Sequence, residues 1–471
     1  METLQRMHNR GSISTGYDID NSVKLESDNT EFFSRSYSSA SNRKTWTYST
    51  WLKMTEIGIN NYFFDAYNNS NTWFILGIAS TGRIVFYDIV AGTDYGKQTD
   101  RLLRDTAAWY HIVFVSDTTN STAGDRYRVY VNGVRETNFN TDYGDVPQNY
   151  DGNVNNALVH SVGKRTDGPS YFNGYLAETC LVDGTALDPT SFGEFDSDSG
   201  IWKPIDVSGL TFGTNGFYLD YEDASDLGDD ESGNGNDFTE NNIAAADQAT
   251  DTPTNNFCTM NMLNRTDGNS KTQEGGTKLT TDGGSDWCSM VATMGVTKGK
   301  WYWETERGTN DVVQGIVGSE DDFIPYSSAA KYYVGNVAER SSMGFYSNAN
   351  PNMRNGNGMS FDFDAGDILM IGLDMDNSKL YFGVNGTWQG SGDSIGGNTA
   401  GASTLWDDFD NEFVLPAVSV YQGGNMKINF GGYTCISISS GASDANGYGT
   451  FEHAPPSGYY ALCTKNLEEF G

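Results

Sequence analysis

The feature that most constrains this chain is an alternation of apolar and polar residues that is closed repeatedly by Asn-Gly pairs. The stretch GDILMIGLDMDNSKLYFGVNGTW, residues 366–388, alternates toward one turn, resumes its alternation and turns again at Asn385-Gly386. The stretch DRYRVYVNGVRETNF, residues 125–139, contains a second such pair, Asn132-Gly133. Type I′ turns need two residues at positive φ, which Asn-Gly tolerates best. The pattern therefore predicts antiparallel hairpins in two distant parts of the chain, and it makes the Asn-Gly pairs structural.

The composition points the same way. Aromatic residues make up 13% of the 471 residues, and 55 residues are Gly while only 10 are Pro. Aromatic residues favour strands and Gly favours tight turns. No long apolar stripe with helical spacing is evident in the sequence. An all-β fold of antiparallel sandwiches is therefore predicted.

The charge restricts the partners. The chain has 62 acidic and 29 basic residues, which gives a formal net charge of −33. Such a field repels polyanions, so nucleic acid is not expected as a partner. Two interpretations of the acidity stay open: solubility, or carboxylates that hold divalent cations.

Targeting signals and cysteine frameworks are not evident. The N-terminal residues METLQRMHNRGSISTGYDIDNS contain no apolar signal-peptide core, and no apolar run approaches the roughly 20 residues of a transmembrane helix. We therefore expect cytoplasmic synthesis without secretion by a signal peptide, and no membrane insertion. The five cysteines include no C-x-x-C pair, so they are expected to be small buried side chains rather than a disulfide framework.

The pattern along the chain predicts four parts. Residues 1–20 are polar and are interpreted as an attachment segment, and residues 21–222 carry strands at a spacing typical of a sandwich. Residues 223–274 are acidic, rich in Gly and Asn and poor in aliphatics, which fits a linker, an ordered ion-binding loop or a belt laid over a neighbouring part. Alternation returns over residues 275–471, which predicts a second sandwich.

The second sandwich resembles a SPRY (B30.2-type) domain. The matching stretches, in the order of that family, are GKWYWETE (299–306), QGIVGSED (314–321), residues 366–388 and VLPAVSVYQGGNMKINFG (414–431). The resemblance implies a bent two-sheet β-sandwich whose loops bind a partner without catalysis. Since the binding loops of that family vary, no single ligand residue is carried over, and the loop 339–358 is the first place to examine.

The first sandwich resembles a laminin-G-like, concanavalin-A-type jelly roll over about residues 20–220. The stretches that carry this resemblance are NRKTWTYSTWLKM, AWYHIVFVSD, RYRVYVNGV and YFNGYLAETCLVDGTALDPTSFGEF. Together with LGDDESGNGNDFTENN and DTPTNNF, the arrangement is similar to virion surface proteins of tailed bacteriophages, especially marine ones. That resemblance implies a virion surface location, attached to the tail or the capsid.

A calcium site is one hypothesis for the acidic segment DASDLGDDESGNGND, residues 223–237. Glycines allow the sharp backbone that folds oxygen atoms around one ion. The segment lacks the register of an EF-hand, so a solvated acidic turn stays open as the alternative. No cofactor is expected to be required, and the candidate ligands for calcium are Asp223, Asp226, Asp229 and Asp237.

Contact with sugar is the hypothesis for three other stretches. In NNYFFDAYNNSNTW, residues 60–73, amide side chains surround aromatic residues, which suits the recognition of hydroxyl groups. Period-2 counting places Tyr62 and Phe64 on one face of a strand and Phe63 on the other, so core packing stays open for each aromatic residue. With GKRTDGPSYFNG (163–174) and the loop 339–358, the candidates are Asp65, Tyr67, Asn69, Asn71, Trp73, Arg165, Asp167, Tyr171, Phe345, Tyr346, Asn348 and Arg354.

Catalysis is not predicted. The four histidines, His8, His111, His160 and His453, lie far apart without metal-ligand spacing. The sequence contains no G-x-S-x-G, H-E-x-x-H or phosphate-binding loop motif. Glycoside hydrolysis needs two carboxylates only, and a polysaccharide hydrolase therefore stays as a third alternative.

The sequence thus leads to one expected function and one main alternative. We expect a non-enzymatic, tail-fibre-like surface protein of a bacteriophage that binds a host-cell glycan or receptor through its loops. A homotrimer is expected, because multivalency compensates weak single-site affinity, and residues 1–20 are expected to bind other virion proteins. In the alternative, both sandwiches dock on virion subunits as a decoration protein of the capsid or tail.

Overall fold

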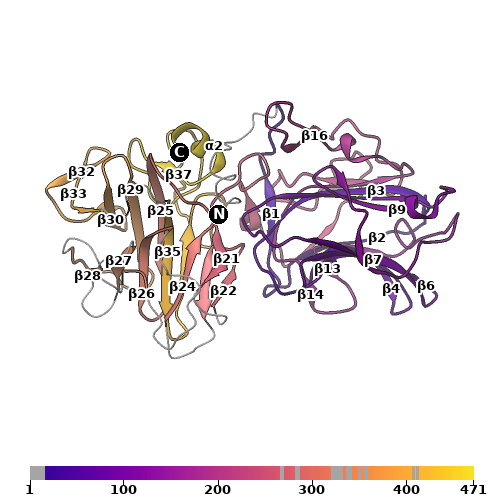
Figure 1. Cartoon of the computed structure of the whole chain (residues 1–471), viewed down its shortest axis with the longest axis horizontal. Helices are drawn as coiled ribbons and strands as arrows, with labels where there is room; N and C mark the ends of the chain where they lie inside the picture. Colours follow the sequence, from indigo (N-terminus) through magenta and orange to yellow (C-terminus); the bar gives the residue numbers. More distant parts are fainter. Residues whose placement is uncertain are drawn as a thin grey trace. The chain divides into compact units, whose positions relative to one another are not determined.

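The computed structural model describes residues 16–265, 270–281, 287–319, 333–335, 342–347, 352–354, 359–405, 409 and 413–471, with only the backbone described for 352–354. The chain divides into two compact units, which we call the N-terminal unit, Ile13–Thr254, and the C-terminal unit, Asn255–Gly471. Both are built from antiparallel strands, and the described residues contain one α-helix, α2 (Thr464–Phe470), so the all-β prediction is confirmed (Figure 1).

One sheet of the N-terminal unit is centred on β3, and we call it the β3 sheet. Its order is β10-β9-β8-β3-β15-β1-β20, with β18 paired to β15. These strands are β10 (Val134–Arg135), β9 (Tyr127–Val131), β8 (Tyr110–Asp117), β3 (Thr45–Met54), β15 (Gly174–Asp183), β1 (Ser22–Leu25), β20 (Gln248–Ala249) and β18 (Phe217–Leu219).

The other large sheet of this unit, the β5 sheet, has the order β11-β7-β6-β5-β4-β12-β2-β19. Two short hairpins, β13-β14 and β16-β17, lie outside the large sheets. The strands are β11 (Phe139–Asp142), β7 (Thr93–Leu102), β6 (Arg83–Val90), β5 (Thr72–Ile78), β4 (Asn61–Asn69), β12 (Val159–Val162), β2 (Phe32–Ser36), β19 (Thr239–Asn241), β13 (Lys164–Arg165), β14 (Ser170–Tyr171), β16 (Gly193–Phe195) and β17 (Trp202–Pro204).

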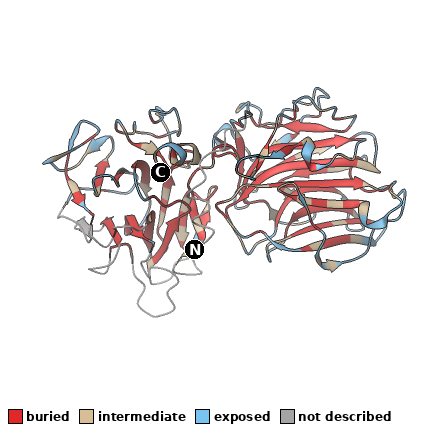
Figure 2. Cartoon of the chain, turned by 45° about the horizontal axis from the view of Figure 1, so that its top comes forward, coloured by how far each residue is buried: buried red, intermediate tan, exposed pale blue. Residues whose placement is uncertain are grey.

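The core of the N-terminal unit is an aromatic cluster contributed by strands of both large sheets. The ring of Trp46 stacks on Phe114 at 5.3 Å and meets Phe74 edge-on at 5.5 Å. Phe64 stacks on Tyr48 at 4.4 Å. All five side chains are fully buried, and burying each one stabilises the unit by roughly 1.5–3 kcal/mol. Figure 2 shows buried residues running along these strands.

The outer side of the β3 sheet is covered by the segment that follows β15. Phe192, Val207 and Phe212 pack there against a cluster that includes Val113 and Val182. Both faces of this sheet are therefore buried, as the unbroken burial of β15 shows. The outer face of the β5 sheet is consequently the place to look for a site on this unit.

The acidic segment after residue 222 is part of the N-terminal unit as far as Thr254. Phe238 lies in its core, β19 pairs with β2, and β20 pairs with β1. The unit therefore extends beyond the predicted end at residue 222, and residues 223–254 form a belt on it rather than a free linker. The physical reason is local: a few apolar side chains and short strand pairings are enough to hold an otherwise polar segment.

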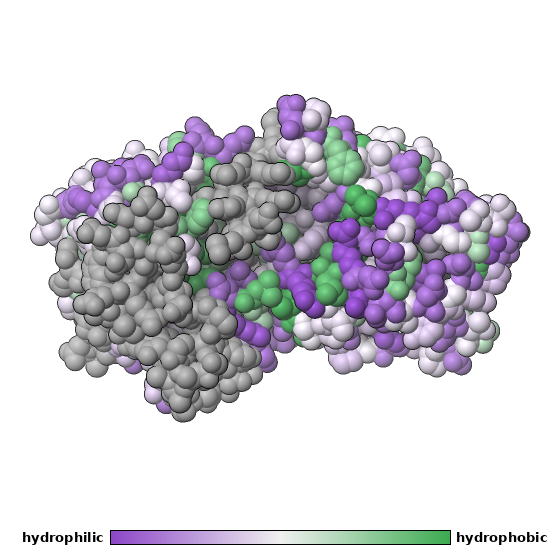
Figure 3. Space-filling model, in the orientation of Figure 1, coloured by the Kyte–Doolittle hydropathy of each residue, from purple (hydrophilic) through white to green (hydrophobic). Residues whose placement is uncertain are grey.

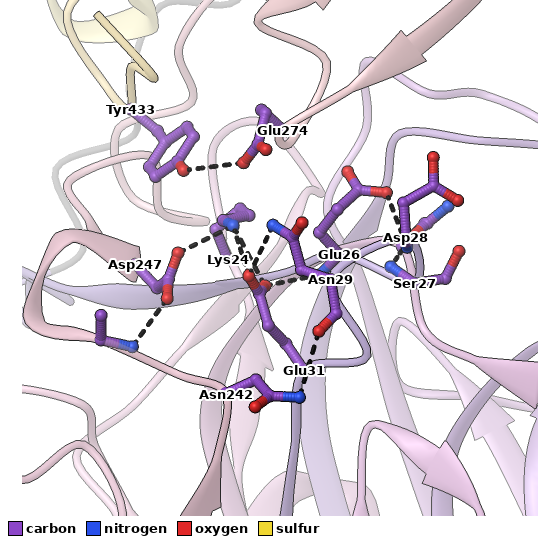
Figure 4. A network of polar contacts seen from close by, with 12 residues as sticks. Lys24, Glu26, Ser27, Asp28, Asn29, Glu31, Asn242, Asp247, Glu274 and Tyr433 are labelled. Atoms are coloured by element: carbon purple, nitrogen blue, oxygen red, sulfur yellow. Dashed lines mark hydrogen bonds and ion pairs between the residues drawn. The ribbon is translucent and has the colours of Figure 1, made fainter. Parts of the chain in front are cut away.

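A buried ion pair helps to hold this belt in place (Figure 4). The Nζ atom of Lys24 lies 3.0 Å from Glu31 Oε2 and 2.7 Å from Asp247 Oδ1. Asp247 in turn accepts a hydrogen bond from the backbone N–H of Ala244. Since removing one partner would leave a buried charge uncompensated, the three side chains depend on one another.

The described end of the N-terminal segment also packs on this unit. The backbone N–H of Ile19 donates to Thr254 Oγ1, and Thr254 Oγ1 donates to the carbonyl of Ile19, both at 3.0 Å. Ile19 is buried in a cluster with Trp51 and Trp202. Residues 16–20 are thus part of the sandwich, whereas the rest of the predicted attachment segment lies outside the described residues.

The C-terminal unit contains a six-stranded and a nine-stranded sheet. The first has the order β21-β24-β35-β26-β27-β28, and the second β22-β23-β36-β25-β29-β30-β31, with β34 paired to β30 and β37 to β25. A hairpin, β32-β33, is separate. The strands are β21 (Met260–Arg265), β22 (Ser270–Gln273), β23 (Lys278–Thr281), β24 (Trp287–Ala292), β25 (Lys300–Arg307), β26 (Val312–Gly318), β27 (Ser342–Tyr346), β28 (Asn352–Arg354), β29 (Ile368–Asp374), β30 (Lys379–Val384), β31 (Thr387–Trp388), β32 (Asp393–Ile395), β33 (Asn398–Ala400), β34 (Ala402–Thr404), β35 (Val414–Tyr421), β36 (Asn425–Asn429) and β37 (Tyr460–Ala461).

Both Asn-Gly pairs form the predicted turns. Asn132 and Gly133 have φ values of 48° and 76° between β9 and β10, and Asn385 and Gly386 have 46° and 83° between β30 and β31. Two consecutive residues at positive φ define the type I′ geometry expected from the sequence. These pairs are structural, as predicted.

Candidate functional site

The outer face of the β5 sheet carries a set of aromatic side chains, which we call the outer aromatic face: Tyr62, Tyr67, Trp73, Tyr87 and Tyr143. Strand register brings them together, because Tyr67 pairs with Trp73, and Trp73 pairs with Ile89 on β6. Tyr87 lies two residues before Ile89 and therefore on the same face. Ile75, Val85 and Ile89 fill the space between the rings.

A β-bulge at Phe63 decides which aromatic residues of β4 join this face. Tyr62 pairs with Gly77 and Phe64 with Leu76, so Phe63 is an extra residue on its strand. Phe63 and Phe64 both lie in the core, whereas Tyr62 lies with the outer cluster. The period-2 prediction that Tyr62 and Phe64 share a face is therefore wrong, because a bulge shifts the alternation by one residue.

Two glycines leave room for tyrosine rings on this face. A Cβ atom on Gly77 would overlap Cδ1 of Tyr62, and a Cβ atom on Gly96 would overlap Cδ1 of Tyr87. Each ring thus occupies the space that a side chain on the neighbouring strand would otherwise fill.

The accessible end of the face lies around Tyr87 and Tyr143. The ring centres of Trp73 and Tyr87 are 6.4 Å apart, and those of Tyr87 and Tyr143 are 5.6 Å apart. Tyr143 is 54% exposed, and Tyr67 and Tyr87 are half-buried. The side-chain amide of Gln98 donates to the hydroxyl of Tyr87 at 2.6 Å, which orients that ring.

Arg165 closes the other end of the face. Its guanidinium carbon lies 4.8 Å from the ring centre of Trp73 and 5.7 Å from that of Tyr62. Asp167 holds the guanidinium, with Oδ1 at 2.5 Å from Nε and Oδ2 accepting from Nη2 at 2.8 Å. The hairpin β13-β14 that carries both residues packs against β4. Two stretches that the sequence marked independently, 60–73 and 163–174, therefore meet at this place.

Asp65 anchors this hairpin from below. Its Oδ2 accepts from the backbone N–H of Thr166 at 3.1 Å and its Oδ1 from the Thr166 hydroxyl at 2.8 Å. Burial raises the pKa of Asp65 to about 7, although the hydrogen bonds from Thr166 oppose this shift. The side chain is fully buried, so its role is to position the hairpin rather than to touch a ligand.

The remaining candidates of this unit lie elsewhere. Asn69 and Asn71 are exposed at the tip of the β4-β5 hairpin, where the side chain of Asn69 accepts from the backbone N–H of Asn71 at 2.9 Å. Tyr171 lies beside Phe32, with ring centres 6.0 Å apart, and Lys164 Nζ lies 5.1 Å from its ring. These three residues are not part of the outer aromatic face.

The candidates of the C-terminal unit do not form one site. Phe345 is fully buried and stacks on Phe361 at 3.9 Å, so it is a core residue and is not available at the surface. Tyr346 is half-buried, and its ring centre lies 5.6 Å from that of Trp287. Its hydroxyl donates a hydrogen bond to Asp311 Oδ2. Asn348 and the side chain of Arg354 lie outside the described residues.

The acidic candidates for calcium take part in turns. Asp223 accepts from the backbone N–H and the hydroxyl of Ser225, and Asp237 accepts from the backbone N–H of Asp230. The backbone N–H groups of Asp226 and Asp229 donate to the carbonyls of Asp223 and Asp226. In the described part of the chain, no group of three or more His, Cys, Asp or Glu side chains could hold a metal ion. Calcium binding thus stays a prediction from composition, which a calorimetric titration would check.

The contact between Ser49 and His111 is not suited to catalysis, because the imidazole proton lies on the nitrogen that faces the serine. Nε2 of His111 lies 2.8 Å from the hydroxyl of Ser49, and Nδ1 accepts from the indole N–H of Trp202 at 2.9 Å. Burial lowers the pKa of His111 to about 3, so the ring is neutral. Since an indole nitrogen can only donate, the single proton of the imidazole is on Nε2 and points at Ser49. His111 therefore cannot accept the proton of that serine.

Sequence reasoning missed three members of the site. Tyr87 could have been found, because Val85, Tyr87 and Ile89 alternate within RIVFYDIV. Gln98 and Tyr143 gave no such signal, since they join the face through the pairing of β7 with β6 and through the bond from the Tyr143 backbone N–H to the Gly96 carbonyl. These are long-range contacts that a local pattern does not contain.

One face of the N-terminal unit is mainly polar. On the face of the N-terminal unit seen in Figure 3, hydrophilic residues predominate and hydrophobic residues form small separate spots. Among the residues that the structure describes, no helix is both long enough and apolar enough to span a membrane.

Comparison with known protein families gives a match within the N-terminal unit. Residues 23–190 match the family model described as the concanavalin A-like lectin/glucanases superfamily, in agreement with the laminin-G resemblance. No curated protein sequence matches the chain.

Three solved structures illustrate the structural similarity. The SPRY domain of human HERC1 is 18% identical, with a TM-score of 0.25, and the match covers 36% of this chain and 96% of that domain. The TRIM65 PSpry domain is 14% identical, with a TM-score of 0.27 and coverage of 36% and 91%. The heptameric SAP-like pentraxin from Limulus polyphemus is 17% identical, with a TM-score of 0.27 and coverage of 36% and 79%.

Proposed function

We propose that this protein binds carbohydrate without processing it, and that the outer aromatic face of the N-terminal unit is the binding site. The observation that carries the proposal is the row of rings that runs from the buried Trp73 to the accessible Tyr87 and Tyr143, with neighbouring ring centres 6.4 and 5.6 Å apart. The apolar C–H face of a pyranose matches the face of an aromatic ring. The match of residues 23–190 to a superfamily of lectins and glucanases supports the same class of ligand.

Polar groups at the border of the row can recognise hydroxyl groups. Gln98 reaches the Tyr87 hydroxyl, and the paired side chains of Arg165 and Asp167 offer donors and acceptors beside Trp73. A mostly apolar surface with a few placed polar groups is the usual composition of a small-molecule site.

The side chains around the face favour binding over catalysis. Glycoside hydrolysis requires one carboxyl group that gives a proton and a second one that acts as base or nucleophile. Asp65 is buried beneath Thr166, and both oxygens of Asp167 are engaged by Arg165. Neither carboxyl group is placed to serve as half of such a pair. Of the carboxyl groups that contacts and register place on this face, Asp94, opposite Ile89, then remains, and within the described ranges it has no second member.

The test is sugar binding by tyrosine variants. We expect Tyr87→Ala and Tyr143→Ala to weaken retention on polysaccharides in affinity electrophoresis severalfold, since each variant removes one ring from the apolar part of the site. Tyr171→Ala is the matched control, because Tyr171 is a half-buried tyrosine outside the face. Equal retention of all four proteins, or a loss confined to Tyr171→Ala, would contradict the proposal.

The finer role that we propose is that of a tail-fibre-like protein on the surface of a bacteriophage particle, with the sugar belonging to the host cell. Its support is the resemblance of the sequence stretches LGDDESGNGNDFTENN and DTPTNNF to such proteins. Homotrimeric assembly would raise the avidity of weak single sites. Binding to whole host cells that added polysaccharide blocks would support this role, whereas sugar-independent binding to emptied capsids or tails would favour a decoration protein.

A further inference from the structure

The charged groups on the outer aromatic face restrict the charge of the sugar that can bind there. Contacts and strand alternation place two cations there among the described residues: Arg165, over Trp73, and Arg83, which alternates with Val85 and Tyr87 on β6. They also place three carboxyl groups on this face: Asp65, Asp94 opposite Ile89, and Asp167. The face is therefore not cationic, and it belongs to a chain with a formal net charge of −33.

Both cations are already paired with carboxylates, Arg165 with Asp167, and Arg83 with Asp100, whose Oδ1 lies 3.5 Å from Arg83 Nη1. Asp167 engages Arg165 through both carboxylate oxygens, at 2.5 Å from Nε and 2.8 Å from Nη2. One charge-assisted hydrogen bond, from Nη2, joins the two groups, and the approach of Oδ1 to Nε adds charge attraction without a second hydrogen bond. The pair that Asp167 forms with Arg165 occupies the edge of the guanidinium that a carboxylate or sulfate group of an acidic sugar would need.

The same pair suits uncharged hydroxyl groups. A hydroxyl group can accept a hydrogen bond from an arginine N–H and donate one to a carboxylate oxygen without separating the two side chains. An acidic sugar would have to displace Asp167 and approach Asp94 as well, and like charges brought together cost several kcal/mol.

We infer that the outer aromatic face takes neutral sugars and excludes acidic ones, and that Asp167 sets this specificity by occupying Arg165. The inference rests on the proposed carbohydrate-binding function and adds the class of sugar. Asp167 is thus a specificity-determining residue whose replacement changes which ligands bind, and not only how tightly.

The experiment compares neutral and acidic polysaccharides on the whole chain. The probes are dextran, mannan, xylan and galactan, set against dextran sulfate, alginate and polygalacturonate, in affinity electrophoresis at low and high salt. Wild type should be retained by at least one neutral polymer, independently of salt, and by no acidic one. Retention by acidic polymers alone would overturn the inference and leave carbohydrate binding intact. Retention by none of them would overturn the proposed function itself.

Two variants then test whether Asp167 sets the specificity. Asp167→Asn keeps an acceptor for Arg165 but removes the charge, so it should gain binding to an acidic polymer by about tenfold or more, in a salt-dependent manner. Arg165→Gln should not show this gain, and circular dichroism should show that both variants are folded. A folded Asp167→Asn protein that still rejects every acidic polymer would overturn the role of Asp167.

Discussion

The guanidinium carbon of Arg165 lies 4.8 Å from the ring centre of Trp73. This contact joins a hairpin of two-residue strands, β13-β14, to the centre of the β5 sheet. It also shields the ring of Trp73, which is 9% exposed, whereas Tyr143 on the same face is open to solvent. The contact is thus both a structural clasp and the border of the proposed sugar site.

Arg165→Ala should lower the free energy of unfolding of the N-terminal unit by roughly 0.5–2 kcal/mol, because cation–π contacts with Trp73 and Tyr62 are lost. Urea unfolding followed by near-ultraviolet circular dichroism measures this loss. Lys164→Ala is the control for site-specific effects: Lys164 lies over Phe32, at 4.2 Å, and its loss should leave the environment of Trp73 unchanged. An Arg165→Ala protein as stable as wild type would contradict the clasp.

Gly77→Ala should disturb the outer aromatic face from within the sheet. The new Cβ would overlap Cδ1 of the Tyr62 ring and crowd the backbone carbonyl of Asn61, so the ring and its strand must shift. We expect a loss of roughly 1–3 kcal/mol of stability, as in other overpacked sites, together with weaker sugar retention. Gly92→Ala provides a contrast, because Gly92 has a φ of 78° and no atom lies near the position of its missing Cβ. Any loss of stability in that variant reflects backbone strain alone. Its sugar retention should be unchanged.

Trp202→Phe should lower the free energy of unfolding of the N-terminal unit, because it removes the indole N–H that donates to His111. The variant keeps a ring between Gly133 and Gly193 but removes the donor to Nδ1, leaving a buried acceptor unpaired. The expected loss is roughly 1–3 kcal/mol. Replacing His111 by Phe in the same protein should cost less than the sum of the two single changes, since both partners are then apolar. Strict additivity in urea unfolding would contradict this pairing.

Glu178 should make the stability of the N-terminal unit depend on pH. Burial raises the pKa of this carboxyl group to about 8, against a hydrogen bond from Tyr218 that lowers it. In the unfolded chain the group ionises near its ordinary pKa of 4.5. Between these two values the folded protein holds a proton that the unfolded chain has released, so stability falls as pH rises, by up to about 1.4 kcal/mol per pH unit.

Unfolding between pH 7.5 and 8 measures this effect. Burial lowers the pKa of His111 and His160 to about 3 and 4, unfolded histidines are mostly neutral there, and Asp65, whose pKa burial raises to about 7, is mostly ionised. The variant Glu178→Gln keeps an acceptor for Tyr218 and cannot ionise, so its stability should change less over the same range. A slope as steep as that of wild type would show that another group is responsible.

The strands and turns of this protein could be predicted because their causes are local. Asn132-Gly133 and Asn385-Gly386 form the expected turns, since positive φ at two successive residues is a property of the residues themselves. Alternation likewise predicted β6 and β9 within a few residues. The all-β fold with two sandwich units follows from such signals added along the chain.

The site could be predicted only in part. Tyr67, Trp73, Arg165 and Asp167 lie together, and they come from the stretch 60–73, predicted from its amide and aromatic residues, and from the second candidate stretch, 163–174. Phe345 belongs to the loop that the SPRY resemblance indicates, but it lies in the core. Composition does not distinguish an aromatic residue that faces solvent from one that faces the opposite sheet.

The sequence by itself determined that this chain forms antiparallel strands, where most of them turn, and that it is strongly acidic, because these properties depend on residues close together in the chain. Tertiary structure alone decided that Phe63 is a bulge, that Tyr62 is turned outward, and that Arg165 reaches Trp73. One extra residue in a strand reverses every later side chain, and a clasp between segments about 90 residues apart exists only after the sheet has formed.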